Sequence, residues 1–310
     1  MLRGEGGRPC PPTFPGSHQF LRLLDIMGID ATNGMIVNLG ATLLHLGPSG
    51  LVVNRRSAQD EAWQLFLRHP TLHLRMVAYE GNTSAYLATR AYLEHFELED
   101  QHAKRRLQLV NEFVASTTLP GDLRSRGVPH APLLLKVDID SIDLPVLDAV
   151  LDHFRPHLIW AEVNYAIQLP IFFAALEARA SQPGPRPTYG KGLLWRFAHC
   201  AGASLAAFER LALRHSFAVV QTDSKNVLLV RSEHSSILNA SNSVRCHAHR
   251  MAVRQAEIDR HLSNRSALVA ALRAREAVIR GICARAHTPF NLSWTLDEER
   301  QESLQSTRVP

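Results

Sequence analysis

Short, unbroken apolar runs recur along the chain and alternate with segments of helical periodicity. Such runs are typical of parallel strands that are buried on both faces. The clearest ones are at 35–39, 133–138 and 158–162, and the last two end in an acidic residue. Further strands are predicted at 51–54, 72–77 and 107–114, and helices at 17–27, 57–67, 83–97, 146–151 and 204–215. Strands and helices in alternation predict an α/β protein.

The last two strands of this series are predicted at 217–222 and 227–231, with only four residues between them. Four residues cannot form the crossover that parallel strands need, so this pair must be an antiparallel hairpin. The expected architecture is therefore a Rossmann-like, doubly wound, mostly parallel sheet with an antiparallel C-terminal hairpin. Ligands of such sheets bind beyond the carboxyl ends of the strands. The polar residues and glycines expected there are Asn38, Gly40, Asn54, Asp138 and Glu162.

The composition and the hydrophobic periodicity of the chain change after the hairpin. Residues 243–286 contain no proline and one glycine, and they carry nine arginines against three acidic residues. Apolar residues recur at near-heptad spacing, which predicts an amphipathic, basic helical tail. This tail can pack on its own domain or bind a protein partner or an acidic surface. The expected organisation is an N-terminal segment with a short helix (1–29), a sheet domain (30–232) and a helical tail (233–310).

Composition narrows the possible partners and the compartment. The net charge is +5, but only four of the 34 basic residues are lysine, so the charge by itself does not favour nucleic acid as a partner. No apolar run is long enough to span a membrane, and the N-terminus lacks a secretory signal. The four cysteines form no CxxC pair, which indicates free thiols and no zinc ribbon. We expect a cytoplasmic protein without a metal site.

The segment Asp138–Asp143, which follows a buried strand, is the most informative one for chemistry. Asp138 and Asp140 form a DxD pattern, which metal-dependent sugar-nucleotide transferases use to hold a cation. The phosphotransferase pattern DxDx[TV] is not met, because Ser141 and Ile142 follow Asp140. A third interpretation is structural, in which one of these residues caps the following helix.

The same segment resembles a known family. LLKVDIDSIDLPVLDAVL (134–151), followed by RPHLIWAEVNYAI (155–167), is similar to the strand, helix and strand motifs of FkbM-type S-adenosylmethionine-dependent methyltransferases. GVPHAP (127–132) and the final helix and hairpin (200–231) extend the similarity. GMIVNLGA (34–41) resembles the first strand and glycine loop, and GLVVNRR (50–56) resembles the second strand. The resemblance implies a class I methyltransferase fold, with S-adenosylmethionine as cofactor and methyl transfer to oxygen on a small molecule or a carbohydrate.

The resemblance also implies roles for individual residues. Cofactor binding would fall to Asn38, Gly40, Ala41, Asn54 and Asp138, and catalysis to Asp138, Asp140 and Glu162, with Asn164 at the acceptor. The residue at 54 would lie beside the ribose hydroxyls, where the family normally has an acid.

The chain departs from the family in two places. One is Asn54 itself, and the other is the spacing after Gly40, where only nine residues precede Gly50. A crossover with its helix needs at least about 10–12 residues. This spacing predicts that much of the cofactor loop is absent. Two alternatives therefore remain beside an active methyltransferase: a catalytically degenerate protein that binds a partner, and a metal-dependent sugar-nucleotide transferase.

Overall fold

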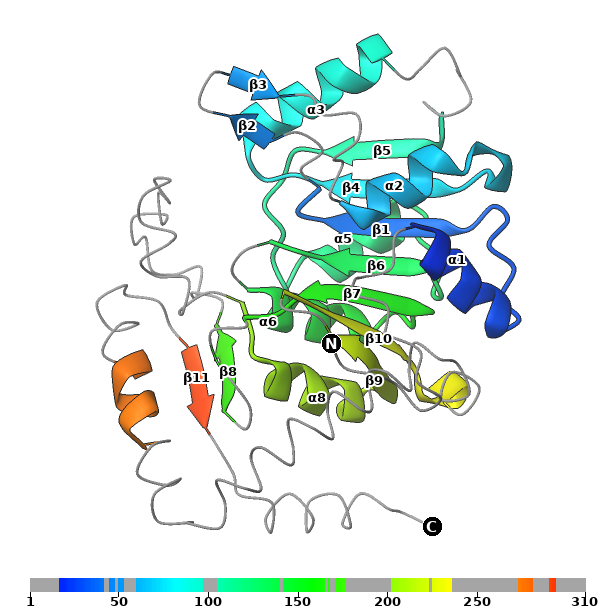
Figure 1. The fold of residues 1–310 in the computed structure, drawn as a ribbon. Coiled ribbons are helices and arrows are strands. Elements are labelled where there is room, and N and C mark those ends of the chain that lie inside the picture. The colour runs from blue at the N-terminus through cyan, green and yellow to red at the C-terminus, as the bar shows by residue number, and fades with distance from the viewer. Residues whose placement is uncertain are drawn as a thin grey trace, which may run out of the picture.

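The computed structural model of the chain is shown in Figure 1. It describes residues 17–41, 45–47, 50–52, 60–96, 105–139, 142–164, 167, 171–176, 202–222, 225–235, 273–280 and 290–293.

A seven-stranded sheet forms the centre of the molecule (Figure 1). Its strands are β1 (Met35–Leu39), β4 (Arg75–Tyr79), β5 (Leu107–Val110), β6 (Leu134–Val137), β7 (Leu158–Glu162), β9 (Phe217–Thr222) and β10 (Asn226–Arg231). The order across the sheet is β5-β4-β1-β6-β7-β10-β9. The first five pair in parallel, and β10 runs antiparallel to both of its neighbours. This order with one reversed strand is that of the class I methyltransferase fold, as expected.

Helices cover both faces of this sheet. One face carries α1 (Ser17–Ile26), α2 (Glu61–Arg68) and α3 (Thr83–Phe96), and the other carries α5 (Leu119–Ser125), α6 (Asp143–Leu151) and α8 (Leu205–Arg214). Residues of β1 alternate between the two hydrophobic cores, with Ile36 in one and Val37 in the other. All five residues of β1 and all four of β6 are buried, which explains why these strands are apolar apart from Asn38 and Lys136.

The second strand of the sheet is not the one that the sequence predicted. Gly50–Val52 (β3) pairs with His45–Gly47 (β2) in a separate two-stranded hairpin. The neighbour of β1 on this side is β4, paired in register from Met35 opposite Arg75 to Leu39 opposite Tyr79. The interpretation of 50–56 as the second strand is therefore wrong. The connection from β1 to β4 includes α2, so the short spacing after Gly40 does not shorten the crossover.

Shorter elements complete the described part of the chain. These are the 3-10 helices η1 (Pro70–Leu72) and η3 (Ser232–His234), and the strands β8 (Phe172–Ala175) and β11 (Phe290–Ser293). β11 pairs antiparallel with β8, so this part of the predicted tail returns to the sheet domain. Residues 273–280 are helical, as the tail's periodicity predicted. No helix in the described segments is long and apolar enough to cross a membrane.

The topology places one crevice at the centre of the sheet. β4 and β6 lie on opposite sides of β1. The chain adds β4 and β5 on one side of β1 and then crosses to the other side to add β6. Ligands of open α/β sheets bind at such a switch point, beyond the carboxyl ends of the strands. Here that crevice lies between the ends of β1 and β6.

Candidate functional site

The turn after β1 is built on a close contact between two strands. Gly40 has φ +81°, and a Cβ at this position would overlap the backbone carbonyl of Asp138. The backbone N–H groups of Gly40 and Ala41 both donate to the Tyr79 carbonyl, at 3.1 and 2.9 Å. A glycine is required here by the packing of the strands themselves. This packing fixes the ends of β1, β4 and β6 against one another.

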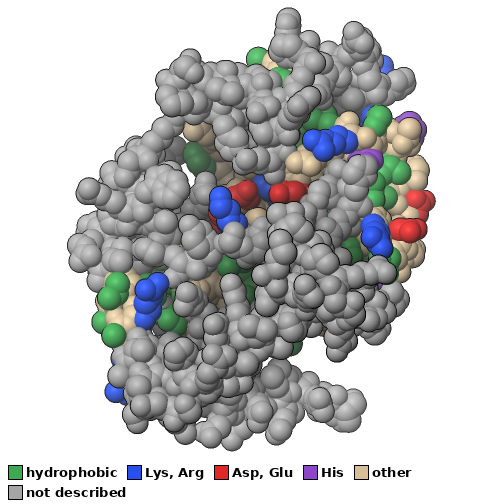
Figure 2. Space-filling view, in the orientation of Figure 1, with side chains coloured by type: hydrophobic (Ala, Val, Ile, Leu, Met, Phe, Trp, Pro, Cys, Tyr) green, Lys and Arg blue, Asp and Glu red, His purple; other side chains and the backbone are tan. Residues whose placement is uncertain are grey.

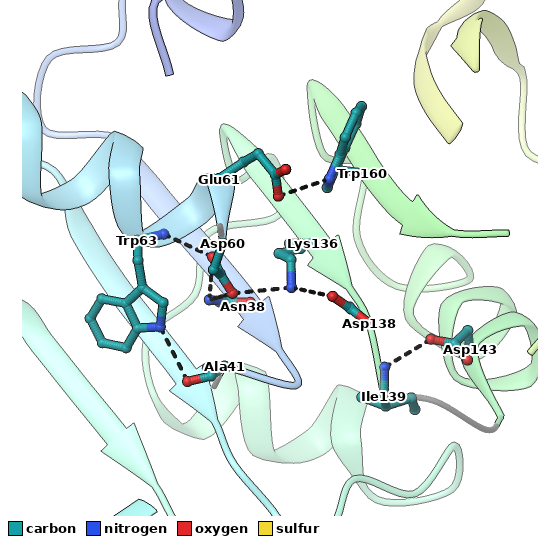
Figure 3. Close-up of polar contacts among 10 residues, drawn as sticks. All are labelled: Asn38, Ala41, Asp60, Glu61, Trp63, Lys136, Asp138, Ile139, Asp143 and Trp160. Carbon is teal, nitrogen blue, oxygen red and sulfur yellow. Dashed lines mark hydrogen bonds and ion pairs between the residues drawn. The ribbon is translucent and has the colours of Figure 1, made fainter. Parts of the chain in front are cut away.

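A buried lysine lies beneath this turn. Lys136 on β6 is 3% exposed, and its Nζ is 3.1 Å from Asp60 Oδ2 and 2.9 Å from Asp138 Oδ2 (Figure 3). Burial disfavours the charged ammonium, but the two carboxylates outweigh this effect and raise the pKa of Lys136 above its ordinary value. Lys136 therefore remains a cation and joins Asp60 to the predicted site residue Asp138.

Asp60 connects the N-terminus of α2 to the sheet. As the N-cap residue, it accepts a hydrogen bond from the Trp63 backbone N–H at 3.0 Å. The Asn38 side-chain amide donates to both carboxylate oxygens of Asp60, at 3.2 and 3.1 Å. The Trp63 indole N–H donates to the Ala41 carbonyl at 3.2 Å. These contacts hold α2 over the crevice between β1 and β6.

Glu61, the first residue of α2, is a third carboxylate at this place, beside Asp60 and Asp138. The Trp160 indole N–H on β7 donates to Glu61 Oε2 at 3.2 Å (Figure 3). Burial raises the pKa of Glu61 to about 7, and the carboxylates of Asp60 and Asp138 act in the same direction while Lys136 opposes them. A carboxyl group with such a pKa can exchange a proton near neutral pH. Figure 2 shows acidic and basic side chains close together in the hollowed centre of this face.

Glu80 directly follows β4 and is the acid at the end of the true second strand. It is 6% exposed, and its Oε1 accepts from the Asn82 backbone N–H at 2.8 Å. The Asn111 side chain, which follows β5, donates to the Glu80 carbonyl at 2.8 Å. Phe113 is 75% exposed, and its ring lies against Gly81, where a Cβ would collide with it. A carboxylate and an aromatic ring therefore lie at neighbouring strand ends.

The residues predicted from the sequence fall into three groups. Asn38, Gly40, Ala41 and Asp138 come together at the ends of β1 and β6, and the Asp138 side chain is 38% exposed. Glu162 and Asn164 lie at the end of β7, one strand further, where the Asn164 N–H donates to the Ala203 carbonyl at 2.8 Å. Asn54 and Asp140 lie outside the described residues.

The segment after Asp138 is fixed by another acid. Asp143 is fully buried at the start of α6, and its Oδ1 accepts from the Ile139 backbone N–H at 2.9 Å. In Figure 3 this bond ties the end of β6 to the helix that follows. Of the two acids that flank Asp140, one therefore faces the crevice and the other holds the loop.

Four residues of the site were missed by sequence reasoning: Asp60, Glu61, Glu80 and Lys136. Two of them had a visible signal. Met76–Glu80 is an apolar run that ends in an acid, the same pattern that identified 133–138 and 158–162. Lys136 is a cation within a continuous apolar strand and two residues before an acid, and a buried cation requires a partner.

The strand order of the sheet, with β10 reversed, is that of the class I methyltransferase fold, and the fold is assigned on this order. No family model matches the chain, and no curated protein matches it. Among solved structures, an O-methyltransferase from Bacillus cereus in complex with S-adenosylhomocysteine is 12% identical, with 72% of this chain and 84% of that chain covered and a TM-score of 0.36.

Two further structures are similar in the same way. A methyltransferase from Podospora anserina bound to S-adenosylhomocysteine is 12% identical, with 69% and 77% of the two chains covered and a TM-score of 0.39. A glycopeptide N-methyltransferase complexed with S-adenosylmethionine is 13% identical, with 74% and 98% covered and a TM-score of 0.34.

Proposed function

We propose that the chain is an S-adenosylmethionine-dependent methyltransferase of the FkbM type that methylates an oxygen of a small molecule or a carbohydrate. One observation carries this proposal: Glu80 directly follows β4, the strand next to β1, at the same edge of the sheet as Gly40 and Asp138. The family has an acid at the end of its second strand. Asn54, the residue that the sequence pattern places there, does not supply this acid. With β4 as the second strand, the family pattern has its acid.

The crevice offers groups that fit the parts of this cofactor. The Glu80 carboxylate can accept hydrogen bonds from two ribose hydroxyls, and the exposed Phe113 ring next to it offers a flat apolar face for a base. Toward β6, Asp60, Glu61 and Asp138 supply negative charge, which suits the cationic end of the molecule. Bound there, the cofactor supplies a methyl group on a positively charged sulfur.

The contribution of the chain to methyl transfer is mainly one of positioning. An in-line displacement needs the acceptor oxygen held opposite the leaving sulfur, and a carboxylate can take the hydroxyl proton. Asp138 and Glu162 end adjacent strands, β6 and β7, so an acceptor could lie between them and meet Asn164. Asp140 stays a predicted member of this group.

The structure bears differently on the two alternative functions, a metal-dependent sugar-nucleotide transferase and a degenerate binding protein. A metal-dependent sugar-nucleotide transferase needs Asp138 to bind a cation, but the Lys136 ammonium, 2.9 Å from Asp138 Oδ2, already occupies one of its two carboxylate oxygens. No observation in the described residues favours that function. A degenerate protein that binds a partner through residues 243–286 remains the alternative that the experiment must separate, because all but 273–280 of that segment lies outside the described residues.

Calorimetric titration with S-adenosylhomocysteine tests the proposal. We expect micromolar binding by the wild-type chain, weakened about 10–100-fold in Glu80→Gln because a charged hydrogen bond is worth about 1.5–3 kcal/mol. Asp138→Ala should weaken binding as well. Glu94→Gln is the matched control, because Glu94 pairs with Arg90 on the exposed side of α3 and its side chain is 58% exposed. Absence of binding to the folded wild-type chain up to millimolar ligand would refute the proposal and favour a degenerate protein.

A further inference from the structure

The charges at the crevice do not balance. Asp60, Glu61 and Asp138 supply three carboxylates. Among the described residues, one ammonium faces them: Lys136 contacts Asp60 and Asp138 and acts electrostatically on Glu61. Figure 3 shows the four side chains around the end of β6 and the start of α2. If all are ionised, the cluster has an excess of negative charge in a largely buried place. Such an excess is costly unless a proton or a bound cation compensates it.

Asn38 provides a second, independent observation. Its side chain is fully buried, and its Oδ1 has no hydrogen-bond partner among the described residues. Asn38 is paired in register with Lys136 across β1 and β6, and its amide nitrogen is used by Asp60. A buried amide oxygen without a hydrogen-bond donor costs free energy, and its partial negative charge adds to the excess that a bound cation would compensate. The cluster as a whole has more acceptors than donors.

We propose that this cluster binds the cationic part of the cofactor and that Glu61 loses a proton when the cation binds. The inference rests on the proposed function and deepens it, since it concerns the same crevice. A positively charged sulfonium would then bind with proton release. The neutral thioether that remains after methyl transfer would bind with less proton release, so Glu61 distinguishes the cofactor from its product.

The surroundings of Glu61 support this behaviour. From β6 it faces Lys136 and Asp138, and from its own helix it faces Asp60, while Trp160 on β7 donates a neutral hydrogen bond. Burial raises the pKa of Glu61 to about 7, so in the free protein the carboxyl group is about half protonated at neutral pH. A cation bound nearby favours the carboxylate and lowers this pKa.

Linkage gives the size of the effect. If the bound cation keeps Glu61 ionised, the affinity follows the fraction of free protein in which Glu61 is already ionised. For a pKa of about 7, this fraction rises about tenfold between pH 6 and pH 8. Binding at pH 6 should release about 0.9 proton, and binding at pH 8 about 0.1 proton.

Calorimetry with two ligands tests the inference. S-adenosylmethionine and S-adenosylhomocysteine are titrated into the wild-type chain at pH 6, 7 and 8, each in two buffers with different heats of ionisation, which gives the protons released. We expect the affinity for S-adenosylmethionine to rise about tenfold from pH 6 to pH 8, and that for S-adenosylhomocysteine to rise less. Glu61→Gln should lose the difference between the ligands, and the exposed control Glu94→Gln should keep it.

The outcomes separate the inference from the proposed function. If neither ligand binds the folded chain, the proposed function fails and the inference with it. If both ligands bind but the wild-type chain releases no proton at pH 6, or the same number with both ligands, the function stands and the inference is wrong. The proton count in the wild-type chain decides this even if Glu61→Gln does not fold. Retention of the full pH dependence by a folded Glu61→Gln would also overturn the inference.

Discussion

Replacement of Lys136 by methionine should destabilise the fold strongly, because it leaves a buried carboxylate without its counter-charge. Lys136 is 3% exposed, and the side chain of Asp60, its buried partner, is 6% exposed. Methionine fills a similar volume, so the packing changes little. The variant therefore isolates the electrostatic effect.

The two ion pairs of Lys136 contribute unequally. The Asp138 side chain is 38% exposed, so water screens this pair, and pairs of that kind are worth about 0–1 kcal/mol. Asp60 keeps its bonds to Asn38 and to the Trp63 N–H but becomes an unpaired buried charge. Loss of one partner of a buried pair costs about 3–5 kcal/mol. This cost corresponds to a fall in Tm of about 6–20 °C for a domain of this size.

Urea denaturation of four proteins measures the effect: wild type, Lys136→Met, Asp60→Asn and the double variant. Asparagine at position 60 can still cap α2, and replacement of a whole buried pair by neutral groups is often nearly neutral. We expect the double variant to be more stable than Lys136→Met, with a coupling of about 2 kcal/mol or more between the two sites. A cost below about 1 kcal/mol for Lys136→Met, or additive effects in the double variant, would refute the reasoning about the buried pair.

Two further variants test other parts of the site. Gly40→Ala should cost clearly more than Gly28→Ala in urea denaturation, because both have positive φ (+81° and +69°) but only a Cβ at Gly40 meets another strand; equal costs would contradict the close contact with Asp138. Without ligand, the free energy of unfolding of Glu61→Gln should depend less on pH between 4.5 and 7 than that of the wild type. In the wild type the folded-state pKa of Glu61, about 7, lies above the ordinary 4.5. The stabilisation from Glu61 is therefore complete below pH 4.5 and is lost as the pH rises to about 7. Between pH 4.5 and 7, the free energy of unfolding of the variant relative to the wild type should rise by up to about 3 kcal/mol. If the two proteins lose stability in parallel over this range, the pKa of Glu61 is not raised.

Much of the fold could be predicted from local sequence. The strands at 158–162 and 217–222 have the predicted bounds, because each is a short apolar run with polar or turn-forming residues on both sides. The hairpin of β9 and β10 followed from the length of one short loop. The antiparallel pairing of the last two strands was therefore present in the sequence, whereas their order in the sheet, with β10 between β7 and β9, came from the structure.

The second strand of the sheet could not be identified in this way. Residues 51–53 and 76–79 are both short apolar runs after β1, and a hydrophobic pattern does not say which partner a strand will pair with. Only the register of β1 with β4 decides it. With β4 as the second strand, the residue at its end is the acid Glu80 and not Asn54.

By itself, the sequence determined the polar ends of the strands and the class of fold, because both depend on periodicity and loop length along the chain. It placed Asn38, Gly40 and Asp138 at one edge of the sheet. The tertiary structure alone decided that Asp60 and Glu61 join them, since these residues reach the crevice through the packing of α2. The pKa of Glu61 has the same origin, because desolvation and neighbouring charges depend on contacts between elements that are far apart in the chain.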